Sequence, residues 1–128
     1  MLLQIIAEDH IRLQFDHGAE GLAIDGAPFG AVQMLAASLA LCTASVLHDY
    51  ATTAQFHLHG LAIVVRWRYA ERPYRVSDYQ MTLMIDPHVP PSRHRALLRA
   101  AEQCTVHNTL THGARVETTL EVQGAQQA

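Results

Sequence analysis

Two cysteines are the residues in this chain best suited to carry chemistry. Cys42 lies within the uncharged run 31–47, and Cys104 follows a second, amphipathic stretch near residue 100. Free cysteines are most often small buried hydrophobic residues, whereas a thiolate beside a positive charge or a hydrogen-bond donor is a nucleophile. His107 follows Cys104 closely, where it either lowers the pKa of that thiol or packs at the start of a turn. The residues alone leave both uses of the cysteines open.

Metal ligation is a third use of the same side chains. Cys104 and His107 have the CxxH spacing of zinc ligands. His48 is the nearest comparable partner of Cys42, so a zinc site requires these two pairs to converge. We hold this as the weaker alternative and predict no resident metal.

Composition excludes several other classes of chemistry. All nine basic residues besides histidine are arginine, so the chain has no lysine for a Schiff base or a P-loop. No GxSxG, HExxH, GxGxxG or GxxxxGK[ST] pattern occurs, which argues against the hydrolases, metalloproteases and nucleotide-binding proteins that carry them. His57 and His59 would share one face of a strand, and we interpret them as exposed residues rather than metal ligands. The net charge of −3 gives no basic footprint for nucleic acid.

The run 31–47 is the element that must position Cys42. It consists of good helix formers and is apolar on all sides, which is typical of a buried helix or a membrane span. A span needs about 20 apolar residues, whereas this run is shorter and contains four polar residues. The N-terminal ten residues lack the basic region of a secretory signal. We therefore predict a soluble cytoplasmic protein with no membrane partner, in which the two cysteines are kept reduced.

Hydrophobic periodicity predicts the remaining elements. Strands are expected at 2–7, 11–16, 22–25, 57–69, 75–85 and 115–122. Helices are expected from 31 to an end near 48–50 and from Pro90 to about Cys104, with a short helical turn at 105–112. The buried stripe of the second helix is expected to comprise His94, Leu97, Leu98, Ala101 and Cys104. Because strands and helices do not alternate, the order predicts one α+β domain, residues 1–128, with a mainly antiparallel sheet packed on the central helix. One sheet covers only one side of an all-apolar helix, so we also predict a homodimer with that helix near the interface.

Two sequence runs resemble a known family. The run Gly30 to Ala44, GAVQMLAASLALCTA, resembles the central helix of the OsmC/Ohr family, the osmotically induced and organic hydroperoxide resistance proteins. The run Ala100 to Leu110, AAEQCTVHNTL, resembles the family's second cysteine motif, which leads into a short helix. The predicted element order also matches that fold, so the resemblance covers nearly the whole chain. It implies an OsmC-like fold built as an intertwined homodimer.

The resemblance further implies a thiol-dependent peroxidase of oxidative stress that needs no cofactor. Cys42 matches the cysteine that attacks an organic or hydrogen peroxide and becomes a sulfenic acid. Cys104 matches the resolving cysteine, which closes a disulfide that an external dithiol reduces. The apolar neighbours Leu35, Leu39 and Val46 suit an organic peroxide.

The chain departs from the family pattern at the residues that hold the reactive thiolate. The family's peroxidases use an arginine and a glutamate, and the position of the glutamate is here Val32 or Gln33. Arg12 is the only candidate for the arginine in the N-terminal strands, and Gln33 can offer it a hydrogen bond but no ion pair. A non-enzymatic OsmC-like homodimer that binds a small apolar ligand at the interface pocket is therefore the alternative function.

Overall fold

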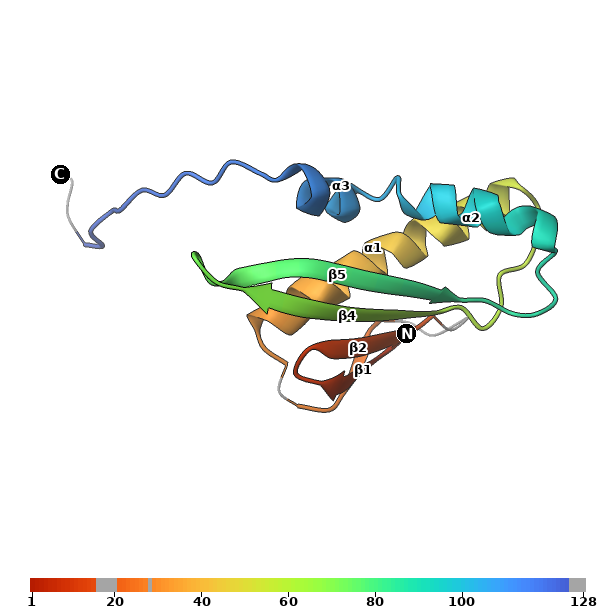
Figure 1. Ribbon diagram of the computed structural model, residues 1–128, viewed down its shortest axis with the longest axis horizontal. Helices are drawn as coiled ribbons and strands as arrows, with labels where there is room; N and C mark the ends of the chain where they lie inside the picture. The colour runs from red at the N-terminus through yellow and green to blue at the C-terminus, as the bar shows by residue number, and fades with distance from the viewer. Residues whose placement is uncertain (16–20, 28, 125–128) are drawn as a thin grey trace.

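The computed structural model describes residues 1–15, 21–27 and 29–124, and its centre is one five-stranded sheet (Figure 1). The strands are β1 (Leu2–Ala7), β2 (His10–Gln14), β3 (Ala23–Asp25), β4 (Ala62–Ala70) and β5 (Arg75–Met84). Their order in the sheet is β3-β1-β2-β4-β5. The pairs β1–β2, β2–β4 and β4–β5 are antiparallel, whereas β1 and β3 are parallel. The prediction of an α+β chain is confirmed, with a mixed sheet.

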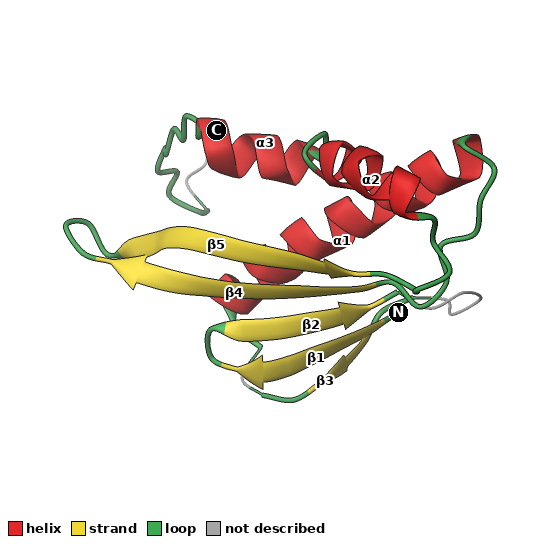
Figure 2. Ribbon diagram, turned by 45° about the vertical axis from the view of Figure 1, so that its right-hand side comes forward, coloured by secondary structure: helices red, strands yellow, loops and turns green. Residues whose placement is uncertain are grey.

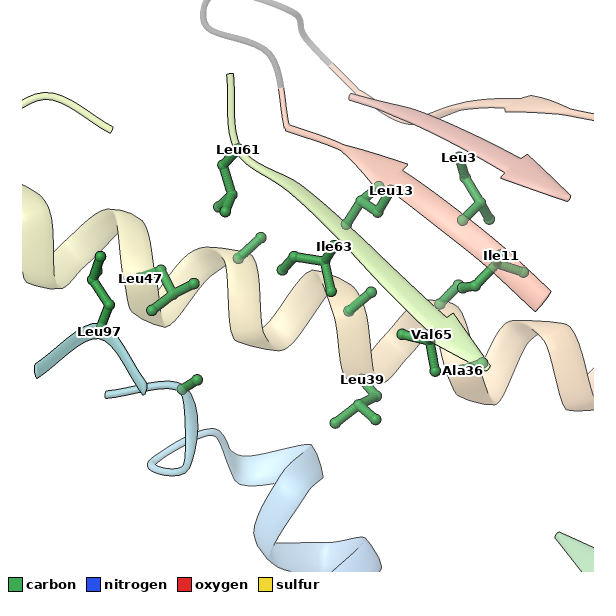
Figure 3. Close-up of a cluster of buried hydrophobic side chains, with 14 of the residues drawn as sticks. Leu3, Ile11, Leu13, Ala36, Leu39, Leu47, Leu61, Ile63, Val65 and Leu97 are labelled. Carbon is green, nitrogen blue, oxygen red and sulfur yellow. The ribbon is translucent and has the colours of Figure 1, made fainter. Parts of the chain in front are cut away.

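Helix α1 (Ala31–Thr53) lies across one face of this sheet (Figure 2). The residues that it turns toward the sheet are small, since Ala36, Ala40 and Ala44 are all fully buried. Small side chains let the helix approach the larger side chains of the strands, and the resulting core is close-packed. Figure 3 shows that core, which contains Leu3, Ile11, Leu13, Leu39, Leu47, Leu61, Ile63, Val65 and Leu97. By length and composition alone α1 could cross a membrane, but its buried residues belong to this core.

The central helix is longer than its sequence pattern indicates. It continues through His48 to Thr53, because Ala51 still packs in the core. Gln55 then takes a left-handed conformation with φ of 61°. The backbone N–H of Phe56 donates to the carbonyl of Ala51, and that of Gln55 to Thr52, which is the Schellman arrangement that ends a helix.

Two predicted strands need correction. The strand expected from residue 57 begins only at Ala62, because Gly60 has a φ of 66° and turns the chain. The strand expected at 115–122 is not part of the sheet within the described chain. The segment keeps its apolar alternation, yet Val116 is 82% exposed and Leu120 is 86% exposed. A strand requires a neighbouring edge, and in Figure 1 this segment runs out from the end of α3.

The second predicted helix ends three residues earlier than expected, and the separate helical turn predicted at 105–112 is confirmed as a helix. A short 3₁₀ turn, η1 (Pro91–Arg93), leads into α2 (His94–Ala101), and α3 (Thr105–His112) follows after a break. Both α helices pack against α1. The predicted buried stripe is correct for Leu97, Ala101 and Cys104 but wrong for His94 and Leu98, of which Leu98 is 61% exposed. Helix α2 therefore buries fewer residues than its sequence pattern predicts, because no element among the described residues of the chain covers its other side.

Candidate functional site

The two cysteines meet where the middle of α1 passes the start of α3. Cys42 projects from α1 and is half-buried, whereas Cys104 is the N-cap of α3 and is 0% exposed. Both are free thiols, and the thiol of Cys104 hydrogen-bonds the sulfur of Cys42. Residues distant in sequence thus form one pair, as a reaction that joins two sulfurs requires.

The first turn of α3 supplies the hydrogen-bond donors of this pair. The first N–H groups of a helix have no partner within the helix. Here the N–H groups of Thr105 and Val106 lie near the sulfur of Cys42 and lower the pKa of its thiol. The N–H of His107 donates to Sγ of Cys104 at 3.4 Å, so Cys104 acts as the capping residue. The free donors of the helix start therefore converge on two sulfur atoms.

These donors favour the thiolate form of Cys42. Burial on its own would raise the pKa of this thiol. The hydrogen bonds from the Cys104 thiol and from the amides of Val106 and Thr105 outweigh burial and hold the pKa below its ordinary value. The positive end of the α3 dipole acts in the same direction. Cys42 is thus the more nucleophilic sulfur of the pair.

Cys104 has the opposite character. Burial raises the pKa of its thiol, and the hydrogen bond that it gives to Cys42 raises it further. The amide of His107 and the hydroxyl of Thr43 work against this rise without cancelling it. The two pKa values are driven apart, so Cys42 loses its proton before Cys104 does.

Gln33 lies at the start of α1, away from the cysteines. Its Oε1 accepts a hydrogen bond from the N–H of Gly30 at 2.9 Å, and its Nε2 donates to the carbonyl of Glu8 at 2.7 Å. The side chain is 5% exposed and closes a capping box. Nine positions of helix separate it from Cys42, roughly 13 Å along the axis. Within one chain Gln33 therefore serves the helix end and does not contact the thiol.

Arg12 lies on the other side of the sheet. Its neighbours on β2, Ile11 and Leu13, are buried in the core beneath α1, so alternation turns Arg12 to the opposite face. There its guanidinium donates to Oε1 of Gln14 at 3.1 Å, and its Nε has no hydrogen-bond partner among the described residues. Within one chain the structure does not bring Arg12 to Cys42.

The zinc arrangement is not assembled. Within residues 1–15, 21–27 and 29–124, no three histidine, cysteine, aspartate or glutamate side chains converge as metal ligands. His48 contacts the ring of Phe15, with the ring centroids 5.3 Å apart. His57 and His59 stack on each other in the loop before β4, with centroids 5.2 Å apart, and both are exposed.

A mainly apolar groove of about 630 Å³ lies between β5 and the helices α2 and α3, and neither cysteine is among its lining residues. Leu39, Ala101 and Leu110 line it, together with Tyr79 and His107. The hydroxyl of Tyr79 and Nδ1 of His107 are buried and have no hydrogen-bond partner among the described residues. The groove thus combines an apolar wall with two unsatisfied polar atoms, which is the chemistry of a small-molecule site.

Sequence reasoning missed the donors of this site. The sequence suggested the histidine ring as the group that lowers a thiol pKa, whereas the structure uses backbone N–H groups at the start of α3. A cysteine directly before a short helical run was the available signal, since an N-cap side chain faces these groups. The roles of Thr43 and Tyr79 could not be predicted. Thr43 lies within an apolar helix pattern, and Tyr79 lies within a strand pattern.

Comparison with known proteins identifies the family and the fold of the chain. The sequence profile of the family described as OsmC-like protein matches residues 25–119. No match was found among curated proteins. The crystal structure of an OsmC-like hydroperoxide resistance protein from Jannaschia sp. CCS1 superposes with a TM-score of 0.63 at 18% identity, covering 94% of this chain and 89% of that one. A protein of Psychrobacter arcticus 273-4, classed with osmotic stress induced and detoxification response proteins, superposes with a TM-score of 0.61 at 17% identity, covering 84% of each chain. At these identities the structures show a shared fold, and the profile, which matches most of the chain, shows that this protein belongs to the OsmC-like family.

Proposed function

We propose that this protein is a thiol-dependent peroxidase that reduces organic or hydrogen peroxides through Cys42 and Cys104. The observation that carries the proposal is the pairing of the two sulfurs at the start of α3, with the pKa of Cys42 lowered and that of Cys104 raised. Membership of the OsmC-like family supports the same class of reaction. The α3 amides offer the thiolate stabilisation that a chain without the glutamate would otherwise lack.

The cycle consists of three balanced steps. The thiolate of Cys42 attacks the terminal oxygen of the hydroperoxide, the O–O bond breaks, and the alkoxide leaves and takes a proton from solvent. Cys104, as thiolate, then attacks the sulfenic sulfur of Cys42 and expels hydroxide, which becomes water. An external dithiol donates two electrons and restores both thiols. A reducing compartment such as the cytoplasm can supply that dithiol.

The apolar groove favours an organic hydroperoxide as substrate. Leu39 lies three residues before Cys42 on α1, and His107 donates its N–H to Cys104, so the groove adjoins the reacting sulfurs. A hydroperoxide carries one O–H donor and two oxygen acceptors, which can satisfy Nδ1 of His107 and the hydroxyl of Tyr79. Hydrogen peroxide would fill none of the apolar wall. We therefore expect a higher kcat/KM for cumene hydroperoxide than for hydrogen peroxide.

The decisive test compares two serine variants in a cumene hydroperoxide assay with dithiothreitol. Cys42→Ser should abolish peroxide consumption, because it removes the attacking sulfur. In a parallel reaction without dithiothreitol, Cys104→Ser should still consume one equivalent of peroxide and accumulate a sulfenic acid at Cys42, which dimedone traps and mass spectrometry detects. Peroxide consumption that survives Cys42→Ser would overturn the proposal.

We propose that the functional unit is a homodimer. Met34 and Leu35 on the outer face of α1 are 54% and 43% exposed, although the helix is otherwise a core element. The segment 114–122 alternates like a strand but has no neighbour within the described chain. A second copy can cover the apolar face of α1 and offer a sheet edge to that segment.

The alternative function is a non-enzymatic dimer that binds a small apolar ligand in the groove beside the cysteines. The unsatisfied Tyr79 hydroxyl and His107 Nδ1 favour it. In that case Tyr79→Phe would weaken the binding of cumyl alcohol, while wild-type protein would leave cumene hydroperoxide intact. Turnover of the hydroperoxide that Cys42→Ser abolishes would exclude this alternative.

A further inference from the structure

Thr43 holds a buried hydroxyl that the fold does not use. The residue is 0% exposed, and its Oγ1 makes no aligned hydrogen bond with any described group. A helical threonine usually donates to the carbonyl four residues earlier, as Thr52 does to His48 at 3.0 Å. An unbonded buried hydroxyl destabilises a fold, so its presence needs an explanation.

The Cys104 sulfur is the group on which this hydroxyl acts. Thr43 lies close enough to that sulfur to lower the pKa of the thiol. A neutral thiol is a weak acceptor, which accounts for the absence of an aligned bond in the reduced protein. A thiolate is a strong acceptor, and it would take hydrogen bonds from both the Thr43 hydroxyl and the His107 N–H. Two donors beside Cys104 thus favour its ionised form, although burial and the Cys42 sulfur keep the pKa of this thiol raised in the reduced protein.

We propose that Thr43 is the positioning residue that stabilises the Cys104 thiolate and so speeds the departure of Cys104 when the disulfide is reduced. The proposal rests on the two-cysteine cycle above. Cys42 is half-buried whereas Cys104 is not exposed, so an incoming thiolate reaches Sγ of Cys42. A bond forms between the reductant sulfur and Cys42, the bond between the two protein sulfurs breaks, and its electron pair goes to Cys104.

The remaining steps follow from that choice of leaving group. The second thiol of the dithiol, as thiolate, attacks its own sulfur bound to Cys42 and releases the Cys42 thiolate, and the dithiol ends as its disulfide. In the forward direction the same hydroxyl helps Cys104 to ionise before it attacks the sulfenic acid. One buried donor thus assists both the formation and the opening of the disulfide, because each step passes through the Cys104 thiolate.

The test uses a disulfide made without peroxide. Diamide oxidises the full-length protein to the disulfide. The reduction of this disulfide by dithiothreitol is stopped with acid at set times, the free thiols are alkylated, and the alkylated fraction is measured by mass spectrometry. Thr43→Val, which keeps the shape and removes the hydroxyl, should slow reduction about fivefold, the loss of one hydrogen bond of about 1 kcal/mol. Thr43→Ser keeps the donor and should reduce at nearly the wild-type rate. The melting temperature of Thr43→Val should not fall, since the lost hydroxyl was unbonded in the reduced protein.

A second measurement separates this role from simple packing. In a Cys42→Ser background only Cys104 titrates as a thiol, and Thr43→Val should raise its pKa whereas Thr43→Ser should not. Equal reduction rates for wild type and Thr43→Val, or equal slowing by both Thr43 variants, would overturn the role of Thr43. Failure of the wild type to consume cumene hydroperoxide would overturn the peroxidase proposal and leave this test intact.

Discussion

At the scale of single residues, the site depends on how two chemically identical side chains are made different. Cys42 faces two backbone amides of α3 and the thiol of Cys104. Cys104 is buried, and its thiol acts as a donor toward the sulfur of Cys42. Burial acts against ionisation at both sulfurs, and the number of donors decides between them. A nucleophile and a resolving thiol therefore arise from position alone.

The ionisation of Cys42 can be tested in variants that leave it as the only thiol. Cys104→Ala removes the hydrogen bond that Cys104 gives, so the pKa of Cys42 should rise. Cys104→Ser retains an O–H donor at the same place and is the matched control, with a smaller rise. Because a lowered pKa means more thiolate at neutral pH, alkylation by iodoacetamide at pH 7 should be slower in Cys104→Ala than in Cys104→Ser. Equal alkylation profiles would show that the Cys104 side chain does not hold the thiolate.

At the scale of elements, the N-terminal ends of α1 and α3 have different roles. The start of α1 is closed by the side chain of Gln33, which takes the N–H of Gly30 and anchors the helix to the carbonyl of Glu8. At the start of α3, cysteine sulfur is the acceptor instead. The first arrangement stabilises a helix, and the second uses the unpaired N–H groups of a helix for chemistry.

Gln33→Leu should lower the free energy of unfolding by about 2 kcal/mol, because it leaves two backbone groups without partners. Its effect on the first peroxide turnover should be small, since the side chain does not reach Cys42. Gln103→Leu is the control, because Gln103 is an exposed glutamine and should change stability by less than about 0.5 kcal/mol. Urea denaturation and a single-turnover assay give the two values. A loss of activity at unchanged stability would assign Gln33 to the site instead.

Most elements could be predicted from the sequence pattern, because β2, β4, β5 and α2 each have one apolar face and α1 is a long run of apolar helix formers. The end of α1 could not, since it depends on the left-handed turn at Gln55. The separate helix at 105–112 was predicted, but the end of α2 at Ala101 was not, because Leu97, Ala101 and Cys104 continue one stripe past that end. The pairing of the cysteines was reached only through a family resemblance, since nothing local in the sequence relates residues so far apart. The donors at the start of α3 are backbone groups, which residue identity does not reveal.

At the scale of the whole molecule, one chain leaves apolar side chains exposed on the outer face of α1 and on the C-terminal segment, among other places. The outer face of α1 carries Met34 and Leu35, and the C-terminal segment carries Val116 and Leu120. Isolated exposed apolar residues are ordinary, but a strand-like segment without a neighbour is not. The sequence predicted a strand at 115–122, and a second copy would restore the pairing that this prediction requires.

The dimer has a direct test in solution. Wild-type protein should have twice the mass of the 14.2 kDa chain by light scattering after size-exclusion chromatography. Leu120→Asp places a charge on the apolar side of the segment and should shift the mass toward that of one chain. Thr119→Asp places the same charge on the opposite side and should leave the dimer intact. A wild-type mass of 14.2 kDa would refute the homodimer.

The donation of α3 amides to sulfur has a thermodynamic counterpart. Whatever free energy the first turn of α3 gives to the Cys42 thiolate, the thiolate gives back to that turn, since coupling between two equilibria is reciprocal. Neutralising the sulfur by oxidation or alkylation therefore loosens the beginning of α3. Only Gly113 separates the end of α3 from the C-terminal segment, so the charge on one sulfur and the order of the last helix vary together.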